Sequence, residues 1–111
     1  MLEYCKELSS KFPDPLECVF LVNSGTEANE LALRLARTYT KSKETIVMEH
    51  GYHGNSNSVV EVSHYKFSRK GGKGPEDYIH SIPIPDPLRS RHLDYNNIIQ
   101  NILKKIKNNG K

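Results

Sequence analysis

The sequence has only two cysteines and no long apolar run, and these absences exclude several classes of protein. Cys5 and Cys18 stand far apart with no C-x-x-C spacing, so free thiols in a reducing compartment are expected, with one disulfide of a secreted protein as the alternative. No segment approaches the roughly 18 apolar residues of a membrane span, and no signal peptide is visible. We therefore predict a cytoplasmic protein without a membrane partner; organelle targeting stays open.

The sequence also lacks a strong excess of either charge. It has 16 lysine and arginine residues against 13 aspartate and glutamate residues, a net charge of +3. The lysines gather in two clusters, but no recognition motif accompanies them, so a solvated surface is favoured over nucleic-acid binding. At 111 residues, of which 36% are hydrophobic, the chain is long enough for one domain at most, with a modest core.

Alternating helix and strand patterns predict an α/β fold. They predict, in order, an N-terminal helix at 1–11, a strand, turn and helix at 17–40, a strand and turn at 45–54, a helix (or a strand) at 55–63, an exposed loop at 68–77, and a strand and final helix at 78–110. The helix-length connections indicate a mostly parallel sheet with helical crossovers. Three strands make a narrow sheet, so we expect this sequence to be part of a longer one.

Three finer expectations concern burial and helix ends. Residues 17–23 are apolar through their middle, which predicts a strand covered on both faces. A C-cap is expected at Asn109-Gly110. In the helix from residue 25 to about 40, the residues at helical spacing that predict its buried face are Ala28, Leu31, Ala32, Leu35 and Tyr39.

The turn Ser24-Gly25-Thr26, placed between a strand and a helix, has two interpretations. Ser24 and Glu27 have the spacing of a capping box, and from this pattern alone a plain helix cap is favoured. The alternative is an anion site, in which free amides and the positive dipole end of the helix bind a phosphate. Gly25 would then allow close approach to the backbone, and Thr26 would add a hydroxyl donor. Such a turn lies at the carboxyl end of a parallel strand, where ligands bind.

A second turn, His50-Gly51-Tyr52-His53-Gly54, follows the next strand and is expected on the same rim of the sheet. Its glycines would allow Tyr52 to lie flat over a planar ligand, with His53 as a polar edge; the alternative is a tight turn whose Tyr52 packs on the core. A metal site at His50 and His53 is disfavoured because no third ligand follows at convincing spacing. A serine nucleophile at Ser24 is disfavoured too, since the G-x-S-x-G context is missing.

Together, the stretch NSGTEANELALRLAR and the later HGYHG closely resemble the class III aminotransferases, pyridoxal-phosphate enzymes of fold type I. The resemblance implies that Ser24, Gly25 and Thr26 bind the cofactor phosphate and that Tyr52 stacks on the pyridine ring, with His53 beside it. It also implies that the chain, residues 1–111, is part of the large cofactor-binding domain of a three-layer fold. In that fold, later strands separate the first strand from the next two.

A narrower resemblance is to the branch that contains the alanine–glyoxylate aminotransferase 2-like phospho-lyases. It rests on LALRLAR, VSHYKF and PIPDPLRSR, although His64 stands where that branch commonly has proline. The implied activity is transfer of an amino group between an amine or amino acid and an oxo acid, in a homodimer. The alternatives are phosphate elimination from a phosphorylated amine, or a non-catalytic remnant. The family also needs a Schiff-base lysine and an aspartate at the pyridinium nitrogen, and because neither has a candidate here, no catalytic residue is predicted.

Overall fold

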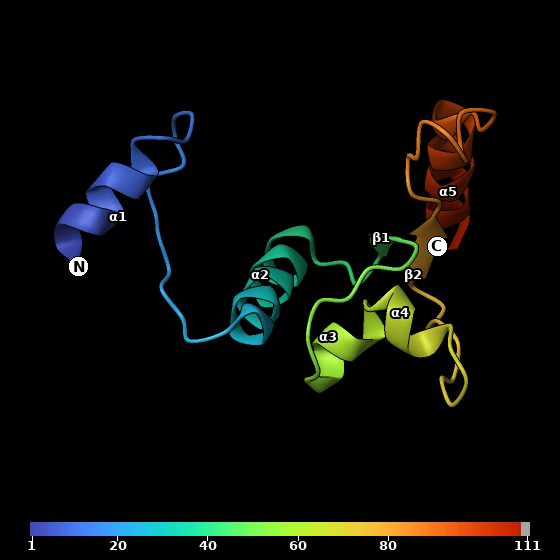
Figure 1. Cartoon of the computed structure of the whole chain (residues 1–111), viewed down its shortest axis with the longest axis horizontal. Coiled ribbons are helices and arrows are strands. Elements are labelled where there is room, and N and C mark those ends of the chain that lie inside the picture. Colours follow the sequence, from blue (N-terminus) through green and yellow to red (C-terminus); the bar gives the residue numbers. More distant parts are fainter. Residues whose placement is uncertain (110–111) are drawn as a thin grey trace.

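The computed structural model describes residues 1–109 and gives them an α/β architecture (Figure 1). Its elements are α1 (Leu2–Ser9), α2 (Gly25–Thr40), β1 (Thr45–Met48), α3 (Asn57–Glu61), α4 (His64–Phe67), β2 (Ile79–Ile82) and α5 (Tyr95–Asn109). Strands β1 and β2 pair in parallel, with Thr45 opposite Ile79 and Met48 opposite Ile82. The coarser fold prediction, parallel strands connected through helices, is confirmed. The wider three-layer sheet is not formed by residues 1–109.

The strand predicted at residues 17–23 is not formed. This segment runs without a strand partner in the described part of the chain, and Figure 1 shows α1 at its far end, away from the sheet. Its apolar side chains are uncovered: Phe20 is 63% exposed and Val22 is 41% exposed. The prediction of burial on both faces is therefore wrong for this structure, because an apolar run becomes a strand only where a neighbouring strand takes up its hydrogen bonds.

The helix predicted at 55–63 is present as α3 over Asn57–Glu61, and α4 is a further short helix that follows the predicted range. Ser63 separates the two helices. Its backbone is extended (φ −91°, ψ 91°), and its hydroxyl accepts a hydrogen bond from the His53 amide. At the other end of the chain, α5 begins at Tyr95 as predicted, and the predicted cap at Gly110 lies outside the described residues. No helix within residues 1–109 has both the length and the apolar character needed to cross a membrane.

A small core lies between the sheet and the helices that connect its strands. Its buried members are Val47, Val59, Val62, Phe67 and Ile79. Helix α2 packs on this core through Leu33, whereas the face predicted to be buried is open, with Leu35 50% exposed and Tyr39 90% exposed. The helical spacing therefore located α2 correctly but did not identify the side that contacts the rest of the described chain.

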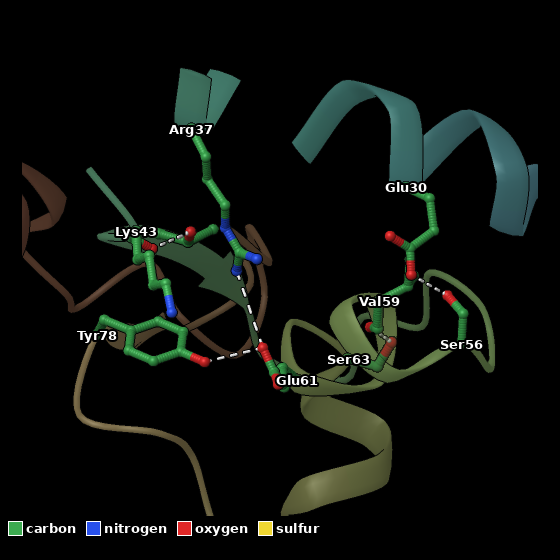
Figure 2. A network of polar contacts seen from close by, with 9 residues as sticks. Glu30, Arg37, Lys43, Ser56, Val59, Glu61, Ser63 and Tyr78 are labelled. Atoms are coloured by element: carbon green, nitrogen blue, oxygen red, sulfur yellow. Dashed lines mark hydrogen bonds and ion pairs between the residues drawn. The ribbon is translucent and has the colours of Figure 1, made fainter. Parts of the chain in front are cut away.

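A polar network connects α2, α3 and the start of β2 beside the core (Figure 2). The Tyr78 hydroxyl donates to Glu61 Oε2 at 2.8 Å, and the Arg37 guanidinium lies 3.9 Å from the same carboxylate. Burial, followed by the hydrogen bond to Glu61, raises the pKa of Tyr78 above its ordinary value of 10.0. The folded chain therefore keeps the Tyr78 proton at a pH where the unfolded chain has lost it.

This difference makes stability depend on alkaline pH. A pKa raised by folding stabilises the protein fully below the unfolded pKa, and the contribution is lost as the pH rises through the folded pKa. We expect the wild type to lose stability relative to Tyr78→Phe as the pH rises above about 10, the pKa of the unfolded chain. The test protein is the one expressed from the reading frame that contains this chain, called the expressed protein below. Urea unfolding of its wild type and its Tyr78→Phe variant over this pH range would measure the difference in stability. A constant difference between the two proteins would contradict it.

Candidate functional site

The first predicted turn does cap α2. Ser24 has the extended backbone of an N-cap residue (φ −156°, ψ 159°), and its Oγ accepts a hydrogen bond from the Glu27 amide at 3.1 Å. The Glu27 carboxylate accepts in return from the Asn23 amide at 2.7 Å, one residue before the position expected in a capping box. The geometry of the turn is therefore that of a helix cap, the first of its two interpretations.

The same cap leaves donors free for a ligand. Among the described residues, the amide groups of Gly25 and Thr26 have no hydrogen-bond acceptor, as the first turn of a helix normally leaves them. Helix α2 is 16 residues long, so its dipole places positive potential at these amides. Gly25 is exposed and Thr26 is partly exposed, so an anion could reach both.

The second predicted turn is held by α4 and by the residue before it. The His50 amide donates to His64 Nδ1 at 3.0 Å, while the backbone of His50 adopts the left-handed conformation (φ 63°). Gly51 accepts from the Tyr65 amide at 3.0 Å. The His53 amide donates to Ser63 Oγ, also at 3.0 Å. Hydrogen bonds therefore fix both ends of the turn.

The ring of Tyr52 is not part of the core. It is 54% exposed and meets the Tyr65 ring edge-on, with ring centres 6.3 Å apart and an angle of 73° between the planes. The Lys66 ammonium group lies 5.5 Å from the centre of the Tyr52 ring. The alternative in which Tyr52 packs on the core is therefore wrong for this structure, and much of its surface is open to a ligand.

The two turns touch, and Gly54 is the residue that makes this possible. A Cβ atom on Gly54 would lie only 2.5 Å from Thr26 Oγ1, and Gly54 has a φ of 137° that side chains other than glycine rarely adopt. Asn29, one turn further along α2, donates from Nδ2 to the His53 carbonyl at 2.8 Å. The two turns that carry the candidate anion site and the candidate ring-stacking residue thus lie against each other, although the strand expected before the first turn is not formed.

The His53 side chain lies on another part of this rim. Its Nε2 is 3.1 Å from the place where a Cβ on Gly51 would stand, so the ring folds back toward that residue. His53 lines an open cavity of about 660 Å³ between α2 and β1, together with His50 and Gly51 but not Tyr52. Within residues 1–109, no three histidine, cysteine, aspartate or glutamate side chains lie close enough together to hold a metal ion.

Sequence reasoning missed two residues of this rim, Asn29 and Ser63. Asn29 lies three residues after Thr26, on the same face of α2, so helical spacing offered a signal for it. Ser63 is 0% exposed, and the only hint in the sequence is a small polar residue beside the apolar Val59, Val60 and Val62. Nothing local shows that its partner is the amide of His53.

Comparison with known proteins decides the family. The sequence profile described as Aminotransferase class-III matches residues 1–111, the whole chain. The chain belongs to the class III aminotransferase family. The family predicted from the two motifs is therefore confirmed.

The curated relatives lie in the predicted branch of this family. An alanine–glyoxylate aminotransferase 2-like protein of Drosophila melanogaster is 48% identical over 94 residues, which cover 85% of this chain and 19% of the relative. An ethanolamine-phosphate phospho-lyase homologue of Caenorhabditis elegans is 42% identical over 101 residues, 91% of this chain and 21% of the relative. The chain thus spans about a fifth of the length of these relatives.

A solved transaminase structure supports the fold. The crystal structure of an S-selective transaminase from Bacillus megaterium superposes with a TM-score of 0.53 and 24% identity, over 78% of this chain and 23% of the transaminase. At this identity the likeness concerns the fold alone. The roles of Ser24, Gly25, Thr26, Tyr52 and His53 stay predictions.

The contact between the two turns can be tested at Gly54. Replacement by alanine forces a strained φ and also drives a Cβ into Thr26, so we expect a loss of about 3 kcal/mol in the free energy of unfolding. Gly71 is the matched control, because it has a φ of 89° but nothing within 4 Å of the added Cβ. For Gly71→Ala we expect about 1 kcal/mol, from backbone strain alone. Equal losses for the two variants in urea unfolding would show that the predicted collision is absent.

Proposed function

We propose that this chain is a piece of the large domain of a pyridoxal-phosphate-dependent enzyme, and that its two turns form part of the cofactor site. The observation that carries the proposal is the contact between the turn at Thr26 and the turn at Gly54. This contact supports the proposal because free amides at the start of α2 lie near a turn that carries a half-exposed aromatic residue. These are two of the features that a phosphorylated planar cofactor requires.

The start of α2 is the proposed phosphate site. The amides of Gly25 and Thr26 are free hydrogen-bond donors at the start of α2, and the Thr26 hydroxyl is a third donor. Hydrogen bonds to a doubly charged phosphate are charge-assisted and stronger than neutral ones. Ser24 contributes by capping α2, which holds the amides in place, and Gly25 leaves room for the anion to approach.

Tyr52 is the proposed stacking residue for the cofactor ring. A ring lying flat against Tyr52 would be limited in its tilt, and so the bond to be broken would keep its alignment with the ring. Pyridoxal phosphate supplies the electron sink for this chemistry, while the protein supplies anchoring and orientation. His53 is the proposed polar neighbour, on the cavity side of the turn.

For the whole protein we propose transfer of an amino group between an amine or amino acid and an oxo acid, in a homodimer. The name of the Drosophila melanogaster relative supports this activity. The lysine and the aspartate that the family uses have no assigned position among these 111 residues, so the isolated chain is expected to be inactive.

A second candidate reaction is elimination of phosphate from a phosphorylated amine. It is favoured by the ethanolamine-phosphate phospho-lyase homologue of Caenorhabditis elegans, which aligns with 91% of this chain. Both reactions use the same cofactor, so residues 24–54 do not discriminate between them. The remaining alternative is a non-catalytic remnant.

The cofactor role predicts how Thr26 variants bind pyridoxal phosphate. Thr26→Val keeps the shape of the side chain but removes its hydroxyl, so we expect about ten- to a hundredfold weaker binding, the effect of one hydrogen bond to a charged group. Thr26→Ser keeps the hydroxyl and is the control, with binding within about threefold of the wild type. Titration of the expressed protein, followed by cofactor absorbance, measures both. Absence of saturable binding by the folded wild type would overturn the cofactor role.

The reaction is tested by offering the two substrate classes separately to the expressed protein with pyridoxal phosphate. Transamination predicts that alanine and glyoxylate are consumed together, whereas elimination predicts that ethanolamine phosphate alone releases inorganic phosphate. Cofactor binding without either reaction would support the remnant.

A further inference from the structure

The peptide groups on both sides of Tyr52 have fixed hydrogen-bond partners. The Gly51 carbonyl accepts from the Tyr65 amide at 3.0 Å, and the His53 amide donates to Ser63 Oγ at 3.0 Å. The His53 carbonyl accepts from Asn29 Nδ2 at 2.8 Å. The Gly51 carbonyl and both polar groups of the His53 backbone are therefore held from α2 or from the α3–α4 region.

Ser63 can make its bond to His53 in only one way. Its side chain is 0% exposed, and its hydroxyl proton is donated to the Val59 carbonyl at 2.7 Å (Figure 2). A serine hydroxyl has one proton, so the oxygen that faces His53 acts there as an acceptor only. This buried hydroxyl therefore fixes the direction of the His53 amide rather than adjusting to it.

The Tyr52 ring makes only peripheral contacts of its own. The residue is 54% exposed, and the ring meets Tyr65 in a T-shaped pair and has the Lys66 ammonium group 5.5 Å from its centre. The direction in which the ring leaves the turn is consequently set by the backbone on either side of it. Two side chains from other elements, Ser63 and Asn29, hold the carboxyl-terminal half of that backbone.

We propose that Ser63 and Asn29 are positioning residues that set the angle at which Tyr52 meets a planar ligand. This inference rests on the proposed function of Tyr52 and extends it to two residues to which neither motif assigns a role. Neither residue is proposed to contact the cofactor. Their effect passes through the backbone of His53.

The first test needs no cofactor. In the unliganded expressed protein, Ser63→Ala should accelerate hydrogen exchange of the His53 amide by about tenfold, because its hydrogen bond is lost. Thr40→Val is the control, since the Thr40 hydroxyl likewise donates to a carbonyl four residues earlier, that of Ala36, and lies at the other end of α2. Unchanged exchange at His53 in Ser63→Ala would overturn the proposed contact.

The second test separates positioning from general weakening. Ser63→Ala should bind pyridoxal phosphate about three- to tenfold more weakly and change the visible circular dichroism of the bound cofactor, which reports its orientation. Binding of inorganic phosphate alone should stay at the wild-type value, because phosphate does not use Tyr52. Equal weakening for both ligands, with an unchanged dichroism per bound cofactor, would indicate a merely structural role and overturn the proposal.

Asn29→Ala provides the same test if Ser63→Ala does not fold, since Asn29 is only partly buried and holds the same residue from α2. The failure of this inference differs from the failure of the proposed function. If the wild type binds no pyridoxal phosphate, the proposed function fails. If it binds the cofactor and both variants leave its affinity and dichroism unchanged, only the positioning role fails.

Discussion

The close approach of Gly54 to Thr26 is the constraint on which the candidate site depends. The first turn opens α2 and the second follows β1, and a side chain at residue 54 would occupy the space of Thr26. Only glycine also tolerates the φ of 137° at this position. The hydrogen bond from Asn29 to His53 strengthens the same junction. Without this contact, the free amides of α2 and the ring of Tyr52 would be two unrelated surface features.

The cap at Ser24 shows that a structural and a functional interpretation of one turn are compatible. The Ser24 hydroxyl accepts from the amide of Glu27, the third residue of the helix, and so it satisfies the donor that lies farthest from the helix end. The amides of Gly25 and Thr26 stay free for that reason. The cap therefore selects which donors remain for an anion.

How much of this could be predicted depends on whether the deciding interactions are local. The bounds of α2 followed from helical spacing and a cap signal. The proximity of the two turns was expected from parallel strand order, although the first of those strands is not formed. The strand at 17–23 and the buried face of α2 were wrong, because burial depends on a partner surface that local spacing does not specify. Ser63 was missed for the same reason: its acceptor role is defined by His53, ten residues away in sequence.

Tyr52 combines a fixed backbone with an uncovered ring, and this combination has an energetic meaning. Holding the turn in place costs conformational entropy, which core side chains recover by burying apolar surface. Tyr52 recovers little, because the residue is 54% exposed. The ordering of the turn is therefore supported by Ser63, Tyr65 and Asn29 rather than by the ring that it presents. A ring held in this way gains its burial when a flat partner covers it, which is the energetic basis of the stacking role proposed for Tyr52.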